Sequence, residues 1–177
     1  MIEEIRRQDI LRIAEQFAAY DVRIFDQQNG FTINNPYGKH AILVESEGDA
    51  PDSSYIVCFT YYHTHLEMPE QVVAFVRDIL EGERVAVVFL KDGKGCMSTE
   101  LTARELQDVS YTMLAERMGF DGTPKPYGPR RHLIDIADSF HVRGWGKDVD
   151  FDAVFVRDEQ GNVMIQKYKP KHIESRA

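Results

Sequence analysis

Three side chains that can exchange protons or bind metal ions follow one another at spacing two: His63, His65 and Glu67. An extended backbone points alternate side chains to the same side, so these three would share one face of a strand. Such a face could act as acid and base in hydrolysis, or could bind zinc or another divalent metal through His63 and His65. The alternative is the solvated end of a structural strand. Both kinds of chemistry need partners from elsewhere, and the candidates are His132, His141 and Asp135.

A second set of candidate residues is basic and lies in the Pro- and Gly-rich stretch 121–131 and just after it. Its members are Lys125, Arg130, Arg131 and His132. Such a set could hold an anion, because arginine binds phosphate or carboxylate through two parallel hydrogen bonds. The alternative is a solvated loop whose charges pair with local carboxylates. The sequence contains no Gly-rich phosphate-binding motif, so no pattern supports a nucleotide site.

Two further patterns favour structural roles. Asp148, Asp150 and Asp152 resemble the start of a calcium-binding loop, but Ala153 stands where that loop needs a glycine, and strand-forming residues follow. Trp145 lies between two glycines, which is more typical of a core tryptophan than of an exposed binding anchor. No GxSxG motif occurs, and neither cysteine has a neighbour in sequence suited to activating it.

Composition and charge limit the classes of function. The 177 residues are 43% hydrophobic and 28% charged, with a net charge of −8. This charge disfavours nucleic acid and would suit a basic protein partner. The N-terminus predicts no secretory signal, and no apolar stretch is long enough to span a bilayer, so we expect a cytoplasmic protein without a membrane partner. In that compartment Cys58 and Cys96 are expected to be buried free thiols.

Hydrophobic periodicity predicts the elements of the first half of the chain. Apolar residues at helical spacing from Ile10 indicate an amphipathic helix that ends near Tyr20. Asn29-Gly30 is typical of a type I′ hairpin turn. Residues 55–62 are almost all β-branched or aromatic, which predicts a central strand running on into the His63–Glu67 end. The strands around them are expected at 22–26, 31–34 and 40–46, and a helix is expected to begin at Pro69 and end at Gly82.

The second half predicts two hairpins and further helices. Strand 84–91 returns through Cys96 after a turn at Asp92-Gly93. A capping box at Thr102 and Glu105 begins a helix that Gly119 ends. Residues 133–140 fit a short helix. Strands 151–157 and 163–169 close the chain around Gly161-Asn162, and the tail 170–177 is expected to fray.

These elements predict the fold class. Strands connect mostly through hairpins, and helices come between blocks of strands, which indicates an α+β protein. We expect a largely antiparallel sheet with about three main helices packed on it. The length favours a single domain spanning residues 1–177.

The stretch YYHTHLEMPEQVVAFVRDILEGERVAVVFLKDG combines a His-containing strand end, an acidic helix and a hairpin. Over roughly residues 55–100 the chain resembles small uncharacterised bacterial α+β proteins, some of them immunity proteins that neutralise toxins. The resemblance implies a binding role and assigns no functional residue.

The sequence therefore predicts a bacterial-type binding protein, of immunity or regulatory kind, that acts on another protein. No cofactor is expected and no complete catalytic set is present. The alternative is a hydrolase, metal-dependent or His-based, that uses His63, His65 and Glu67 and holds an anionic substrate with Arg130 or Arg131. A third interpretation, small-molecule sensing, would use Tyr61, Tyr62 and Trp145.

Overall fold

The computed structural model describes residues 2–48, 54–122, 131–146 and 148–168. The chain divides into two compact units. Unit 1 comprises Met1–Arg84 with Trp145–Lys147, and unit 2 comprises Val85–Gly144 with Asp148–Ala177. Each unit contains one antiparallel sheet of five strands, which confirms the predicted α+β class. The single-domain expectation stays a prediction, and calorimetric cooperativity of unfolding tests it.

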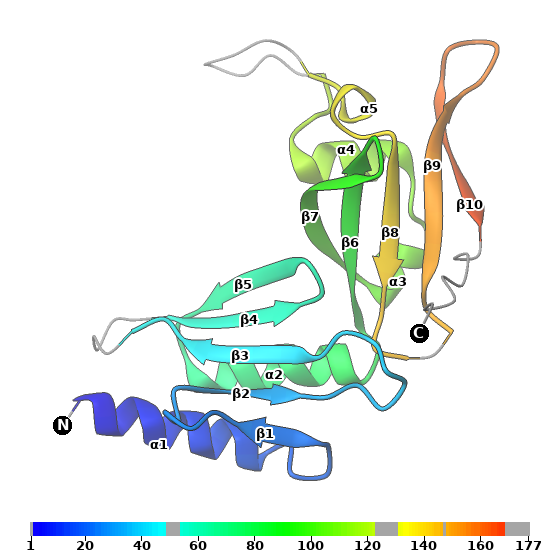
Figure 1. Cartoon of the computed structure of the whole chain (residues 1–177). Coiled ribbons are helices and arrows are strands. Elements are labelled where there is room, and N and C mark those ends of the chain that lie inside the picture. Colours follow the sequence, from blue (N-terminus) through cyan, green and yellow to red (C-terminus); the bar gives the residue numbers. More distant parts are fainter. Residues whose placement is uncertain (1, 49–53, 123–130, 147, 169–177) are drawn as a thin grey trace. The chain divides into compact units, whose positions relative to one another are not determined.

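Unit 1 is a meander whose strands lie side by side in chain order (Figure 1). Helices α1 and α2 pack on the same face of the sheet, because alternate strand residues are apolar and buried there. These buried residues include Phe31, Val44 and Val57. The elements are α1 (Ile2–Glu15), β1 (Val22–Ile24), β2 (Gly30–Ile33), β3 (Ile42–Ser46), β4 (Tyr55–Phe59), β5 (Tyr62–Leu66) and α2 (Pro69–Leu80).

The stretch 55–67 forms two strands, so the expectation of one central strand was wrong. Thr60 and Tyr61 reverse the chain, and β4 pairs antiparallel with β5 so that Phe59 faces Tyr62. The central strand is β3, and β5 is an edge strand. β-Branched and aromatic residues favour strands on both sides of a turn, so their run hid the reversal.

The turn at Thr60 carries backbone strain. Its φ is 60°, in the left-handed region that a β-branched residue rarely occupies. Its hydroxyl oxygen is buried without a hydrogen-bond partner. Both features are unfavourable, and strain of this kind often marks segments that function requires.

The predicted type I′ turn at Asn29-Gly30 was also wrong. The positive φ belongs to Gln28, at 56°, while Gly30 is already in β2. A Cβ at Gly30 would come within 2.5 Å of the Val44 carbonyl oxygen on β3. Gly30 is therefore required for the close approach of two strands rather than for the turn.

Unit 2 contains a sheet of order β10-β9-β8-β6-β7, and three short helices accompany it in the chain. A cluster that includes Phe89, Leu114, Phe140 and Phe155 forms its core. The elements are β6 (Arg84–Lys91), β7 (Lys94–Thr102), α3 (Ala103–Gln107), α4 (Tyr111–Met118), α5 (Leu133–Ile136), β8 (Ser139–Arg143), β9 (Phe151–Arg157) and β10 (Val163–Tyr168).

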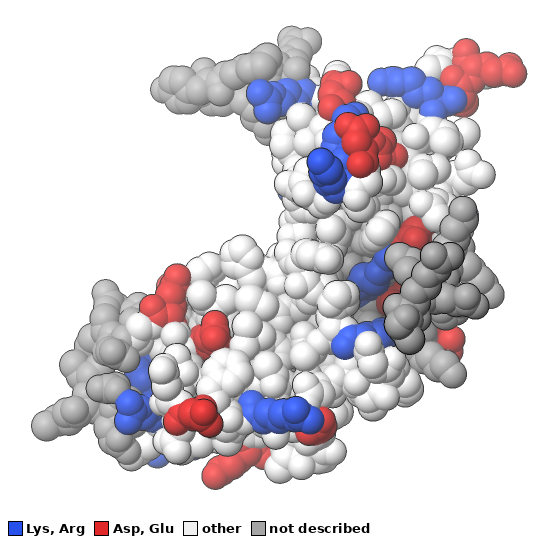
Figure 2. All heavy atoms as spheres, viewed as in Figure 1, with Lys and Arg blue, Asp and Glu red and all other residues white. Residues whose placement is uncertain are grey.

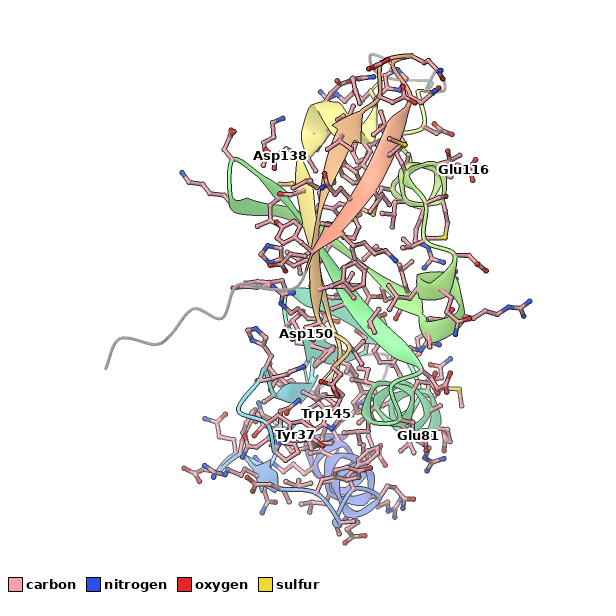
Figure 3. All side chains as sticks on the ribbon, turned by 90° about the vertical axis from the view of Figure 1, so that its right-hand side faces the viewer. Tyr37, Glu81, Glu116, Asp138, Trp145 and Asp150 are labelled. Atoms are coloured by element: carbon pink, nitrogen blue, oxygen red, sulfur yellow. The ribbon has the colours of Figure 1, made fainter. Side chains whose placement is uncertain are left out.

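Several turn and cap predictions for unit 2 are confirmed. Asp92 and Gly93 both have positive φ, and the Asp92 N–H donates to the Asp138 carboxylate at 2.8 Å. The Asp138 side chain is labelled in Figure 3. The Thr102–Glu105 capping box begins α3, and Gly119, with φ 70°, ends α4.

Two predicted helices differ from the structure. The helix expected from Thr102 to Gly119 is divided, because Ser110 caps a new helix with its hydroxyl. Only 133–136 is helical in the stretch 133–140, because Phe140 belongs to β8 between β6 and β9. The expected tail 170–177 lies outside the described residues.

Replacing Thr60 by glycine removes both the unfavourable φ and the buried, unpaired hydroxyl. We expect Thr60→Gly to raise the free energy of unfolding by about 1 kcal/mol, after the greater flexibility of glycine in the unfolded chain is subtracted. Urea unfolding measures this. Tyr61→Gly, next to it at negative φ, is the control and should lower stability; a destabilised Thr60→Gly would contradict the assignment of strain.

Candidate functional site

His63 and His65 lie on β5 and point away from the helices. They share this face of the unit 1 sheet with β4 residues, since Cys58 is opposite His63 and Ile56 is opposite His65. The two imidazole rings are exposed, with centroids 5.5 Å apart. The sequence therefore predicted their common face correctly. We call this surface the open face; its described residues are Arg23, Thr32, Leu43, Glu45, Ile56, Cys58, His63 and His65.

Glu47, a carboxylate that the sequence did not single out, contacts the histidine pair. His65 Nδ1 lies 2.9 Å from Glu47 Oε2, which also accepts a hydrogen bond from the Ser54 hydroxyl. The bonds from Ser54 and from His65 lower the pKa of Glu47. Glu67 follows the end of β5, where its N–H donates to Gln71 Oε1 at the start of α2. Sequence reasoning missed Glu47 because it lies on the loop after β3.

This arrangement can position a proton but lacks the geometry of a serine triad. Ser54 Oγ bonds to Glu47 and lies 3.4 Å from His65 Nδ1, the nitrogen that already faces the carboxylate. A triad needs its nucleophile at the other imidazole nitrogen. The chemistry open to His65 here is proton exchange through Nε2.

Cys58 faces His63 across the β4–β5 pair. Sequence reasoning missed this contact because it did not predict the turn between the two residues. Burial, and then the charge of Glu45, raise the pKa of the Cys58 thiol. The thiol is therefore protonated at neutral pH and is not an activated nucleophile. Both cysteines are free, but Cys58 is only half-buried and Cys96 is exposed, which corrects the expectation of buried thiols.

Within the described ranges, no three His, Cys, Asp or Glu side chains converge in a way that could hold a metal ion. Metal binding by His63 and His65 stays a prediction. The candidate partners have local roles: the His132 N–H donates to Asp135 Oδ2 at 3.3 Å where α5 begins, and His141 contacts residues of its own sheet.

The predicted anion site is only partly described. Lys125 and Arg130 lie outside the described residues, while Arg131 and His132 are exposed. The His132 ring packs over Gly122, where an added Cβ would come within 2.3 Å of it. Anion binding by this loop stays a prediction.

A charged cluster that sequence reasoning missed lies on β8 and β9 of unit 2. Its members are His141, Arg143 and Asp152, with His141 directly opposite Asp152. Arg143 Nη2 lies 2.9 Å from His141 Nδ1 and 2.8 Å from Asp152 Oδ1, while its Nη1 donates to the Val142 and Phe151 carbonyls. The sequence pattern that could have revealed this cluster is the spacing of two between His141 and Arg143. It was missed because no strand was expected at β8.

This cluster has the electrostatics of a structural ion pair. Asp152 is 8% exposed, and its contact with Arg143 is a charge contact without hydrogen-bond geometry. Burial lowers the pKa of His141; Arg143 acts in the same direction, whereas Asp152 opposes it. Because Arg143 can only donate, His141 Nδ1 is the acceptor and the ring is neutral. The three residues thereby connect β8 and β9.

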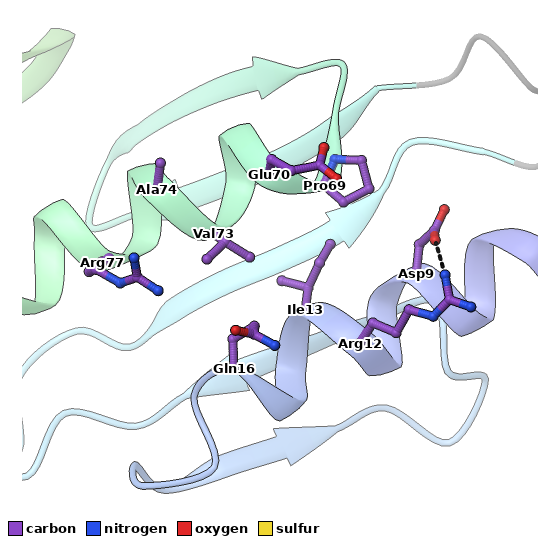
Figure 4. A pocket seen from close by; sticks show the side chains of 9 residues that line it. All are labelled: Asp9, Arg12, Ile13, Gln16, Pro69, Glu70, Val73, Ala74 and Arg77. Atoms are coloured by element: carbon purple, nitrogen blue, oxygen red, sulfur yellow. Dashed lines mark ion pairs between the residues drawn. The ribbon is translucent and has the colours of Figure 1, made fainter.

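A groove runs between α1 and α2, with a volume of about 370 Å³ (Figure 4). Its floor is apolar, from Ile13 and Val73. Asp9 and Glu70 lie toward one end, and Arg77 lies toward the other. The lining residues are Asp9, Arg12, Ile13, Gln16, Pro69, Glu70, Val73, Ala74 and Arg77.

The three aromatic residues of the sensing interpretation pack on different rings. Tyr61 packs edge-on against His40, Tyr62 against Phe75, and Trp145 against Phe59. Trp145 is buried, as expected of a core residue, and its carbonyl accepts a hydrogen bond from the Asn35 side chain. Small-molecule sensing stays a prediction.

Comparisons with protein-family models, with curated proteins and with solved structures find no match to this chain. The resemblance to immunity-type proteins therefore stays a prediction. Among the described helices, none is long and apolar enough to cross a bilayer.

The lowered pKa of His141 predicts how stability depends on pH. The folded state binds fewer protons than the unfolded state, so stability falls as pH decreases from the ordinary value of 6.5 down to the lower folded pKa. The His141→Gln variant should lose the part of the pH dependence of stability that comes from this histidine. Denaturant unfolding at about pH 8 and about pH 5 measures it. His63→Gln is the control. If the stability of His141→Gln fell between about pH 8 and about pH 5 as much as that of the unchanged chain, this result would contradict the role assigned to His141.

Proposed function

We propose that this protein acts by binding a basic partner protein through unit 1, in the manner of an immunity or regulatory protein. The observation that carries the proposal is the distribution of charge. Unit 1 contains fifteen Asp and Glu against eight Lys and Arg, while unit 2 contains fourteen against thirteen. Nearly all of the net charge of −8 therefore belongs to unit 1. An acidic surface accelerates association with a basic protein and selects against acidic ones.

The open face is the surface of unit 1 that best suits such a partner. Both helices pack on the opposite side of the sheet, and half-exposed Leu43 and Ile56 lie beside Glu45 on adjacent strands. An apolar centre with charged neighbours is the usual composition of a protein interface. On the side drawn in Figure 2, the described basic and acidic side chains are interspersed.

Charge reversal on the open face tests the proposal. We expect the full chain to capture a basic protein in stoichiometric amount from extracts of its own cells, with binding that weakens as salt rises. Glu45→Lys should weaken capture at least about tenfold, because it places a positive charge against the partner.

The matched control is Glu15→Lys, which makes the same charge change at an exposed position on α1. It should retain capture. Absence of a basic partner, or equal loss in the two variants, would contradict binding at the open face.

A second candidate function is His-based hydrolysis, which the hydrogen bond between Glu47 and His65 Nδ1 favours because it orients the imidazole. If the protein hydrolyses a phosphoester or ester, His65→Ala should lower the rate by about 10²-fold or more, and Glu47→Gln should also lower it. Unchanged turnover in both variants would exclude these residues. Measurement of zinc in the purified protein separates the metal-dependent form from the metal-free form.

A further inference from the structure

The outer edge of β5 is the feature of unit 1 that is most open to another chain. Among the described residues, β4 is the strand neighbour of β5, and β5 ends the sheet. An edge strand carries backbone N–H and C=O groups without sheet partners, and these groups can pair with a strand of another protein.

The register identifies which backbone groups face outward. A two-residue turn closes on a hydrogen-bonded pair, here Phe59 and Tyr62. Hydrogen-bonded and non-hydrogen-bonded pairs alternate along an antiparallel ladder. The pairs Cys58–His63 and Ile56–His65 are therefore non-hydrogen-bonded pairs. The backbone N–H and C=O of both histidines consequently point away from β4, toward the open edge.

β5 also lacks the residue types that often protect an edge strand. The segment Tyr62–Leu66 contains no lysine, proline or carboxylate. The opposite edge strand, β1, is only three residues long and contains Arg23, and the edge strands of unit 2 contain Lys94 and Lys167. Among the described edge strands, β5 is therefore the one whose side chains least oppose the addition of a strand.

The charged residues near β5 indicate which kind of chain would pair with it. Glu47 contacts His65, Glu67 follows β5, and unit 1 carries a large excess of carboxylates. A second copy of β5 would bring the same carboxylates together, whereas a basic segment would complement them. We propose that β5 accepts an extended, basic segment of the partner protein as an added strand of the unit 1 sheet. This inference rests on the proposed function and specifies how the partner binds.

The first experiment selects from a displayed library of random twelve-residue peptides on the full chain. We expect the selected peptides to be basic, with apolar or β-branched residues at alternate positions. Their binding should slow hydrogen exchange at the His63 and His65 amides. Selection of no peptide, or of peptides that leave these two amides unprotected, would overturn the proposal.

The second experiment compares two substitutions of one residue. His63→Pro removes the outward N–H, whereas His63→Ala keeps it and removes only the imidazole. We expect the proline variant to lose at least about tenfold in peptide affinity, and the alanine variant to lose less than about threefold. Equal losses would show side-chain recognition and overturn the proposal. Thermal melting establishes that each variant folds, and the exchange measurement on the wild-type chain does not depend on either variant.

Three further results separate failure of the edge inference, failure of the proposed function and pairing of two copies of the chain. If capture of the protein partner is weakened by Glu45→Lys but not by His63→Pro, the edge inference fails while the proposed function stands. If no basic partner is captured, the proposed function fails, whereas the peptide selection still reports on the edge. Sedimentation tests whether two copies of the chain pair through β5. If the chain forms a concentration-dependent dimer and His63→Pro abolishes it, a second copy binds at this edge and the proposal is overturned.

Discussion

The reversal of the chain at Thr60 and Tyr61 is the constraint on which the surface of unit 1 depends. Without it, residues 55–67 would form one long strand, and the histidines would extend beyond the sheet. With it, β5 returns beside β4 and becomes the sheet edge, with His63 opposite Cys58. The turn requires a positive φ at a threonine and buries its hydroxyl without a partner. The packing of both strands must compensate this cost.

The alternation of side chains along the strands gives unit 1 two different faces. One face is apolar and buries its residues under α1 and α2, which is the main source of stability for such a layer. The other face carries half-exposed apolar residues together with Glu45, Arg23 and the two histidines. The same strands therefore provide both the core and the surface that we assign to binding.

The two histidine environments show how local partners decide what an imidazole can do. His65 is exposed and hydrogen-bonded to a carboxylate, so it is suited to contact or proton exchange. His141 is half-buried and accepts from Arg143, so it is held neutral within an ion-pair network. The first could contribute to function, whereas the second contributes to the pairing of β8 with β9.

Much of the fold could be predicted from sequence, because local physical rules determine it. Runs of β-branched and aromatic residues predicted the strands, glycine placed the ends of α2 and α4, and the Thr102–Glu105 pair placed the start of α3. Alternation also placed His63 and His65 on one face. These features depend on steric preferences and hydrogen bonds between residues a few positions apart.

Only the tertiary structure decided which distant residues meet. It brought Glu47 to His65, Cys58 to His63, and Asp152 to Arg143, and it made β5 an edge. Strand order and register depend on contacts between segments that are far apart in the chain, and no local spacing encodes them. The sequence by itself therefore determined most of the strands, the ends of several helices and the net charge of −8. The composition of the candidate site and the open edge of the sheet come from pairing between strands.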